Sequence, residues 1–285
     1  MSDADHASRD AGSAAGGHNL ALRIASAVVL APLALGAAYV GGWPFLCFWT
    51  VAAMAVLWEW MALIAGSDSR LAFSVGAVAL IVVAALFELD HPGAAILVVM
   101  LGALATTIFA PAERRLWLAA GVVYAGIMLW APVLLRADAV FGFIALIFLF
   151  AVVWATDILG YFAGRAIGGR KLAPSISPKK TWSGAIAGAA GAMVIALLLA
   201  RFVAGTNWIV IVFIALMLSI IAQAGDLLES ALKRRFGAKD ASQLIPGHGG
   251  VMDRLDGFWA AALIGVLIGL ARGGFDGAAR GLLLW

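Results

Sequence analysis

Residues 226–256 hold most of the side chains in this chain that could carry out chemistry. Counting His248, this segment has eleven acidic or basic residues, whereas only 12% of the whole chain is Asp, Glu, Lys or Arg. Carboxylates can hold a divalent cation, basic side chains can hold phosphates, and glycines let backbone approach a ligand. Since the segment combines all three and adjoins strongly apolar sequence, it favours phosphoryl or nucleotidyl transfer on a lipid over a binding module.

The first half of this segment predicts a polar helix face. Five side chains follow one another at i, i+3, i+4, i+7 and i+8: Asp226, Glu229, Ser230, Lys233 and Arg234. A second acidic pair, Asp253 and Asp256, has i, i+3 spacing. Carboxylates close to hydrocarbon are costly unless they are paired or bound to metal, and oxygen ligands without cysteine or paired histidine favour Mg²⁺ over zinc. The alternative is a salt-bridge ladder within the helix, from the first two carboxylates to Lys233.

The second half combines glycines with charge. Lys239 and Asp240 precede His248-Gly249-Gly250, which leads into Asp253-Arg254-Leu255-Asp256. The glycines allow positive φ and close backbone approach. We expect the first turn of the following helix to offer free N–H groups and a positive dipole end to an anion such as a phosphate.

Two upstream features extend the candidate site. Asp157 is a carboxylate within an apolar run, and it is either a structural partner of Arg165 or a neighbouring helix, or a residue that faces the site. The loop that follows carries two prolines and four polar residues suited to a triphosphate or lipid phosphate: Ser177, Lys179, Lys180 and Thr181. The alternative for this loop is a simple positive-inside topology signal.

The elements that position these residues are membrane helices. With 64% hydrophobic residues and a mean hydropathy of +1.02, the chain is not a soluble globular protein. A run of about 20 apolar residues spans a bilayer. The sequence offers nine such runs, and therefore predicts an all-α polytopic membrane protein: 20–41, 43–65, 71–88, 93–111, 116–135, 139–163, 183–204, 207–226 and 257–271.

The organisation along the chain has three parts. Residues 1–19 are polar and rich in Gly and Ala, which predicts a disordered cytoplasmic tail. Residues 20–138 are expected to form N-terminal transmembrane helices, and residues 139–285 a C-terminal catalytic region with two cytoplasmic loops. Of the 19 Lys and Arg residues, 15 fall in the N-terminal tail and in alternate connecting segments. This asymmetry predicts that the N-terminus and the polar site face the cytoplasm and the C-terminus lies outside.

Taken together, the motifs resemble the phosphatidate cytidylyltransferase (CDP-diacylglycerol synthase) family. The resemblance rests on Ser230-x-x-Lys233-Arg234, on Lys239-Asp240, and on the run from His248 to Asp256. The preceding segment from Gly225 to Glu229 and the segment from Ser177 to Thr181 also match. It implies transfer of CMP from CTP to phosphatidic acid, which gives CDP-diacylglycerol and pyrophosphate in the cell inner membrane.

The resemblance also implies roles for individual residues. It implies that Asp226 and Asp253 are ligands of Mg²⁺, and it is compatible with a second cation such as K⁺. The catalytic set is then Asp226, Asp253, Lys233, Arg234 and Asp256. The substrate-binding set is Ser177, Lys179, Lys180, Thr181, Ser230, Lys239, Asp240, His248, Gly249, Gly250, Arg254 and Asp157. A homodimer is expected from the same resemblance.

Other functions stay open at this point. Another CTP-dependent membrane lipid enzyme, such as a polyprenol kinase, would also need acids and bases at the cytoplasmic face. A secondary transporter would also place carboxylates in the membrane, but with an internal repeat and polar groups near the midplane. The basic loops serve topology and anionic ligands, so no nucleic-acid partner is expected.

Overall fold

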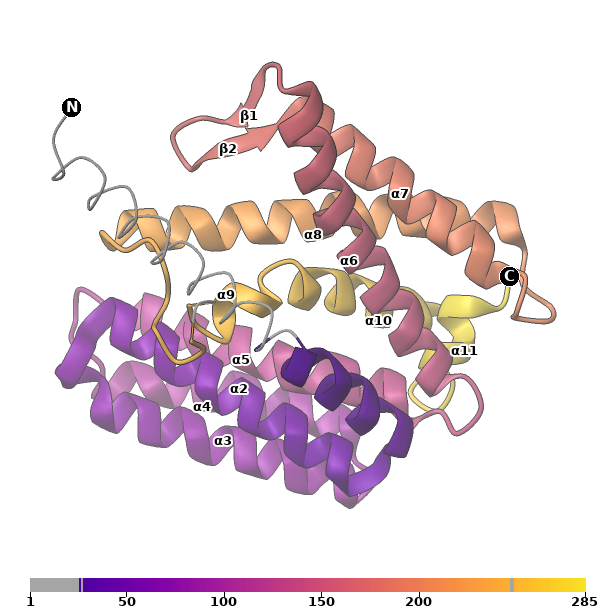
Figure 1. Cartoon of the computed structure of the whole chain (residues 1–285). Coiled ribbons are helices and arrows are strands. Elements are labelled where there is room, and N and C mark those ends of the chain that lie inside the picture. The colour runs from indigo at the N-terminus through magenta and orange to yellow at the C-terminus, as the bar shows by residue number, and fades with distance from the viewer. Residues whose placement is uncertain (1–25, 27, 247–248) are drawn as a thin grey trace, which may run out of the picture.

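The structure is a computed structural model, and it describes residue 26, residues 28–246 and residues 249–285 (Figure 1). Its long helices are α2 (Gly42–Ala65), α3 (Arg70–Glu88), α4 (Pro92–Phe109), α5 (Arg115–Ala137), α6 (Gly142–Ile167), α7 (Trp182–Ala200) and α8 (Trp208–Arg235). The shorter elements are a helix over Val28–Val40, η1 (Gly66–Ser69), α9 (Met252–Leu255), α10 (Phe258–Gly273) and α11 (Ala278–Leu283). The two strands are β1 (Lys171–Ala173) and β2 (Ser177–Thr181).

The prediction of an all-α polytopic membrane protein is confirmed. Seven described helices, α2 to α8, are long and apolar enough to cross a bilayer. Each of the nine predicted runs contains a helix, although the described parts of the first and last are short, Val28–Val40 and Phe258–Gly273. The predicted tail, residues 1–19, lies outside the described residues, so its disorder stays a prediction.

The long helices form two packed groups (Figure 1). Helices α2 to α5 pack against one another, and α6 to α8 form the second group. Helix α10 lies between them and contacts both α5 and α8. Aromatic stacking strengthens this junction, because the Trp49 ring of α2 lies 5.3 Å from the Phe258 ring of α10. The proposed division of the chain near residue 138 stays a prediction about organisation.

Glycines on α7 bring it close to α6. A Cβ added at Gly184 would lie 2.5 Å from the carbonyl oxygen of Gly160, and one at Gly188 would lie 2.5 Å from that of Thr156. Small residues of this kind permit close contact between membrane helices. The small-residue pattern of α7 is therefore used within the chain, where it fixes the polar end of α6 beside α7.

The predicted basic loop between α6 and α7 forms an antiparallel hairpin of β1 and β2. Gly168, with φ of 67°, ends α6 and turns the chain into the hairpin. Thr181 then caps α7, because its side-chain oxygen accepts the N–H of Gly184 at 3.2 Å. These two local signals place the end of the hairpin directly at the start of a membrane helix.

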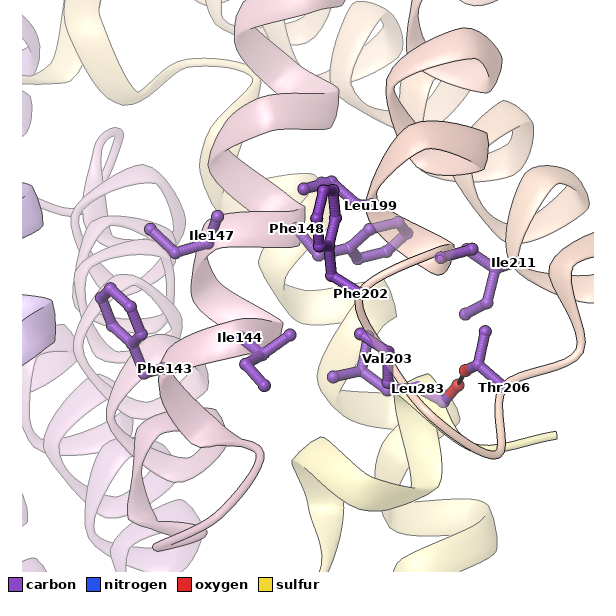
Figure 2. Close-up of a pocket in the computed structure, with 11 residues that line it drawn as sticks. Phe143, Ile144, Ile147, Phe148, Leu199, Phe202, Val203, Thr206, Ile211 and Leu283 are labelled. Carbon is purple, nitrogen blue, oxygen red and sulfur yellow. Dashed lines mark hydrogen bonds between the residues drawn. The ribbon is translucent and has the colours of Figure 1, made fainter.

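An apolar cleft of about 200 Å³ lies at the other end of α6, α7 and α8 (Figure 2). Its lining includes Phe143, Ile147, Leu199 and Ile211. Because Phe143 and Asp157 are 14 positions apart on one helix, this cleft is about 20 Å from the charged end. It is therefore separate from the candidate site.

Candidate active site

Helix α8 carries the predicted polar face as one continuous helix. It extends to Arg235, well past the predicted end of the apolar run at residue 226. Glu229 and Lys233 are buried on this face, and Asp226 and Ser230 are partly buried. The charged face therefore packs into the protein and is not simply a solvated helix end.

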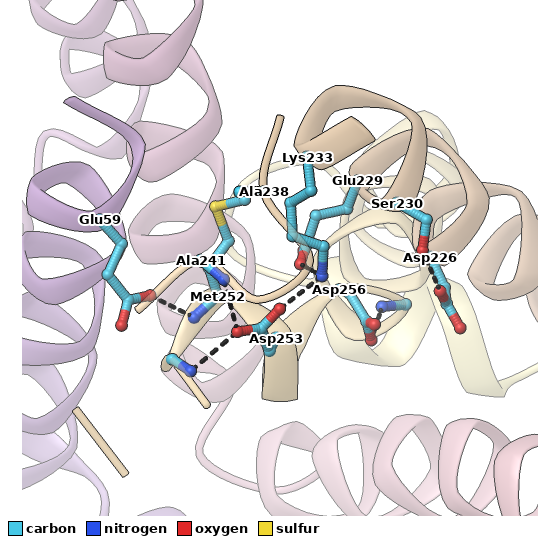
Figure 3. Close-up of polar contacts among 12 residues, drawn as sticks. Glu59, Asp226, Glu229, Ser230, Lys233, Ala238, Ala241, Met252, Asp253 and Asp256 are labelled. Atoms are coloured by element: carbon cyan, nitrogen blue, oxygen red, sulfur yellow. Dashed lines mark hydrogen bonds and ion pairs between the residues drawn. The ribbon is translucent and has the colours of Figure 1, made fainter. Parts of the chain in front are cut away.

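Lys233 is the centre of a buried charge network (Figure 3). Its ammonium group lies 3.0 Å from the Glu229 carboxylate and forms a second ion pair with Asp253. The Tyr124 hydroxyl of α5 donates to the other Glu229 oxygen at 3.1 Å. Buried ions need such partners, because breaking one pair would leave an uncompensated charge. The Glu229–Lys233 part of the alternative salt-bridge ladder is thus present.

Asp226 does not join that ladder. Its carboxylate forms an ion pair with Lys180 of β2, 46 residues away in sequence. Its other oxygen accepts the Ser230 hydroxyl at 3.3 Å. The side chains of Lys180 and Asp226 are 28% and 20% exposed, in contrast to 9% or less for Lys233 and its partners.

The hairpin separates its two lysines. Successive strand residues point to opposite faces, so Lys180 turns towards α8 while Lys179 is exposed. Arg234 is also exposed, and its guanidinium donates to the carbonyl oxygens of Ile176 at 3.5 Å and Ala238 at 3.2 Å. Arg234 thereby ties the turn of the hairpin to the end of α8.

The other predicted substrate-binding residues differ in burial and in local role. Ser177 lies in β2 opposite Ala173, and the buried Thr181 hydroxyl serves as the cap of α7. The remaining charged residues of the predicted set have exposed side chains: Lys239, Asp240 and Arg254. Substrate binding by these residues stays a prediction.

Asp253 organises the loop that precedes α9. One carboxylate oxygen pairs with Lys233. The other oxygen accepts the backbone N–H groups of Ala241 at 2.9 Å and Gly250 at 2.8 Å. Both oxygens are therefore already engaged in this structure.

The glycines before Asp253 behave as the sequence predicts, although His248 lies outside the described residues. Gly249 has φ of 85°, and a Cβ there would lie 2.8 Å from an Asp253 oxygen. At Gly250 a Cβ would lie 2.5 Å from a Glu59 oxygen. Positive φ and close approach are thus both required here.

The anion at the next helix start is different from the one predicted. We expected a phosphate, but the Glu59 carboxylate of α2 accepts the N–H groups of Val251 at 2.8 Å and Met252 at 2.7 Å. The expectation of free N–H groups at this turn was wrong, because a buried carboxylate of the chain itself satisfies these two donors. Phosphate binding at the start of the following span stays a prediction. Sequence reasoning missed Glu59 as a site residue; its signal was a lone carboxylate within an apolar run.

Asp256 and Asp157 complete a second group of carboxylates. Burial raises the pKa of the Asp256 carboxyl well above its usual range, and the negative charges of Asp226, Glu229 and Asp157 add to this increase. Asp157 is exposed on α6, within electrostatic range of Asp226 and Lys180. The guanidinium of Arg165 instead contacts the Tyr161 hydroxyl at 3.5 Å.

The charged residues therefore form two clusters. The hairpin cluster consists of Asp157, Asp226, Asp256, Ser230 and Lys180. The loop cluster consists of Glu59, Glu229, Asp253, Lys233 and Tyr124. Among the described residues, no three His, Cys, Asp or Glu side chains already surround a common metal position.

The chemistry of the hairpin cluster nevertheless suits a hard cation. Its carboxylates supply oxygen ligands, and their mutual repulsion favours a positive charge between them. Lys180 provides one such charge. Asp226 is partly exposed and fits Mg²⁺ once Lys180 leaves its oxygen, and coordination by the buried Asp253 would likewise require Lys233 to leave its oxygen.

Known proteins match this chain over most of its length. Residues 21–270 match the cytidylyltransferase family. A phosphatidate cytidylyltransferase of Brucella abortus (strain 2308) is 46% identical over 253 residues, which cover 88% of this chain and 93% of the relative. A phosphatidate cytidylyltransferase of Haemophilus influenzae is 45% identical over 129 residues, 44% of this chain and 45% of the relative. The chain belongs to the cytidylyltransferase family.

Proposed function

We propose that this protein is a phosphatidate cytidylyltransferase, which converts CTP and phosphatidic acid into CDP-diacylglycerol and pyrophosphate. The observation that carries the proposal is the meeting of Lys180 with Asp226 at the charged end of membrane helix α8. It brings the hairpin motif and the α8 motif into one site, where a nucleotide and a lipid phosphate can meet. The names of the relatives, and their match over most of the chain, support the same substrates.

The reaction needs no covalent enzyme nucleophile. An anionic oxygen of the phosphatidate phosphate attacks the α-phosphorus of CTP. The bond from this phosphorus to the oxygen that bridges to the β-phosphate breaks, and pyrophosphate leaves with that electron pair. The protein must hold the two phosphates in line and offset the negative charge at the α-phosphorus.

The described cations differ in how available they are for this task. Lys180 is partly exposed and has one carboxylate partner, whereas Lys233 is buried between two carboxylates. Lys179 of β2 and Arg234 of α8 are exposed. We therefore assign phosphate binding first to Lys180, Lys179 and Arg234. Lys233 would act mainly by fixing Asp253 and Glu229.

Metal dependence is also part of the proposal. Mg²⁺ would be held by Asp226, and it would stabilise charge on the phosphates when bound. Asp253 is proposed as a second ligand, with Lys233 displaced from it, and a second cation such as K⁺ is compatible with the remaining carboxylates. The donor set of the hairpin cluster supports the Asp226 assignment.

Orientation and assembly complete the proposal. The Lys and Arg asymmetry supports a polar site at the cytoplasmic side of the cell inner membrane. A reporter fused after Trp285 is then expected outside and one fused after Lys180 inside. A homodimer is proposed on family resemblance, and its interface cannot be the α7 face that Gly184 and Gly188 commit to α6.

The test is direct. Purified protein in detergent is incubated with Mg²⁺, CTP and phosphatidic acid, and the products are separated. Formation of CDP-diacylglycerol with an equal amount of pyrophosphate is expected. Release of CDP in place of pyrophosphate, or a need for a polyprenol acceptor, would contradict the proposal and indicate a lipid kinase.

A further inference from the structure

Glu59 is a charged residue in an unusual place. It lies in α2, within the N-terminal group of helices, and its side chain is fully buried. Its carboxylate accepts the N–H group of Met252 (Figure 3), the N–H group of Val251, and the Ser242 hydroxyl at 2.6 Å. Among the described residues no Lys or Arg forms an ion pair with it. Its charge is therefore stabilised by three donors from one loop.

These donors lie at both ends of the loop. Ser242 is at the start, whereas Val251 and Met252 are at the end, so Glu59 joins the two ends. The Asp253 carboxylate makes a second closure between Ala241 and Gly250. The loop is thus closed by two carboxylates, and one of them comes from a helix 183 residues or more away in sequence.

The contacts of Glu59 influence the position of Lys233 through Asp253. Glu59 fixes the backbone at Met252, one residue before Asp253, and Asp253 in turn pairs with Lys233. Gly250 packs tightly against Glu59, since a Cβ at Gly250 would lie within 2.7 Å of both Glu59 oxygens. A change in the Glu59 carboxylate must therefore move the loop or leave buried N–H groups without acceptors.

We propose that Glu59 is a positioning residue for cytidylyl transfer, which holds Ser242 together with Val251 and Met252 so that Asp253 and Lys233 keep their places. The inference rests on the proposed function and extends the site into the N-terminal helices. Glu59 does not touch the reacting atoms; it acts through the loop.

The first test is Glu59→Gln, which keeps the size but replaces one acceptor oxygen with a donor. We expect faster hydrogen exchange in residues 241–246 and 249–252 and a fall in kcat/KM for CTP of at least about tenfold. Thr106→Val is the matched control, because Thr106 is also fully buried but its hydroxyl donates a hydrogen bond to the Gly102 carbonyl of its own helix. The control is expected to change neither loop exchange nor the KM for CTP.

The second test remains informative if Glu59→Gln fails to fold. Gly250→Ala should lower activity, because its Cβ collides with the Glu59 carboxylate. Glu59→Asp shortens that side chain by one methylene, so the double variant should be at least about fivefold more active than Gly250→Ala alone.

Two results would overturn the proposal. One is wild-type loop exchange together with kcat/KM within twofold of wild type in Glu59→Gln. The other is a double variant no more active than Gly250→Ala. If the wild-type protein forms no CDP-diacylglycerol, the proposed function fails, but the exchange measurement still tests the closure of the loop by Glu59.

Discussion

The hairpin cluster and the loop cluster contain the same kinds of residue in opposite states. In the loop cluster, Glu229 and Asp253 are buried and every described carboxylate oxygen has a donor. In the hairpin cluster both Asp226 oxygens also have donors, but Asp226 is partly exposed, and Lys180 faces the charge of Asp157 as well as that of Asp226. A fully satisfied cluster fixes structure, whereas an incompletely neutralised one can accept a cation or a phosphate. The comparison therefore assigns scaffolding to one cluster and substrate chemistry to the other.

The largest effect on activity is expected at Asp226. Asp226→Asn keeps the shape but removes the charge that we assign to the cation, so turnover should fall by about 100-fold or more. Because Asp226 is partly exposed, the melting temperature in detergent should change little. Initial rates and thermal unfolding of the same preparation check both parts. Near-normal turnover would make Asp226 only the partner of Lys180.

Lys233→Met should give the largest effect on stability. It leaves Glu229 and Asp253 as buried carboxylates without their cation. Breaking a buried pair in this way costs about 3–5 kcal/mol. We expect poor recovery of folded protein, measured by size-exclusion chromatography and thermal unfolding. If the variant is as stable as the wild type, the loop cluster is not a scaffold.

Asp253→Asn sharpens the comparison with Asp226→Asn. The amide group has one acceptor oxygen, so it cannot serve Lys233 and the Ala241 and Gly250 N–H groups together. Both stability and turnover should therefore fall, whereas Asp226→Asn loses turnover alone. Equal melting temperatures for the two variants would remove the distinction between the clusters.

Substitution of the hairpin lysines should lower activity by a smaller factor than Asp226→Asn, and the two lysines should differ from each other. Lys180→Ala should reduce kcat/KM for CTP by about tenfold or more, since a charge-assisted hydrogen bond is worth about 1.5–3 kcal/mol. Lys179→Ala should have a weaker effect, because its side chain faces away from α8. Steady-state kinetics with varied CTP checks the order. Wild-type values for both single variants and for the double variant would leave the hairpin as a topology signal.

The smallest effect on activity is expected at Tyr124. Tyr124→Phe removes one donor to the buried Glu229 carboxylate and keeps the ring that packs against Trp259. A loss of about 1.5–3 kcal/mol of stability should follow, with kcat/KM unchanged. Thermal unfolding and initial rates in parallel measure this. A tenfold loss of activity at unchanged stability would place Tyr124 in the chemistry.

Periodicity predicted much of this molecule, because a bilayer constrains helix length and polar spacing directly. The nine apolar runs all contain helices, and the spacing of Asp226, Glu229 and Lys233 gave the correct face of α8. The positive φ of Gly249 also followed from residue type.

Pairings between distant segments could not be predicted in this way. The local sequence offered Lys233 as the partner of Asp226, whereas its actual partner Lys180 depends on how the hairpin folds onto α8. Glu59 shows the same limit, because its partners lie 183 residues or more away. The expectation of free N–H groups at the start of α9 was wrong for this reason.

Binding of Mn²⁺, as a paramagnetic substitute for Mg²⁺, tests the contrast between the clusters most directly. Electron paramagnetic resonance of the free ion would give the dissociation constant for wild-type protein, Asp226→Asn and Tyr124→Phe. The account predicts that Asp226→Asn weakens binding by about tenfold or more, while Tyr124→Phe keeps the wild-type value. Equal Mn²⁺ affinity in the wild type and in Asp226→Asn would contradict it.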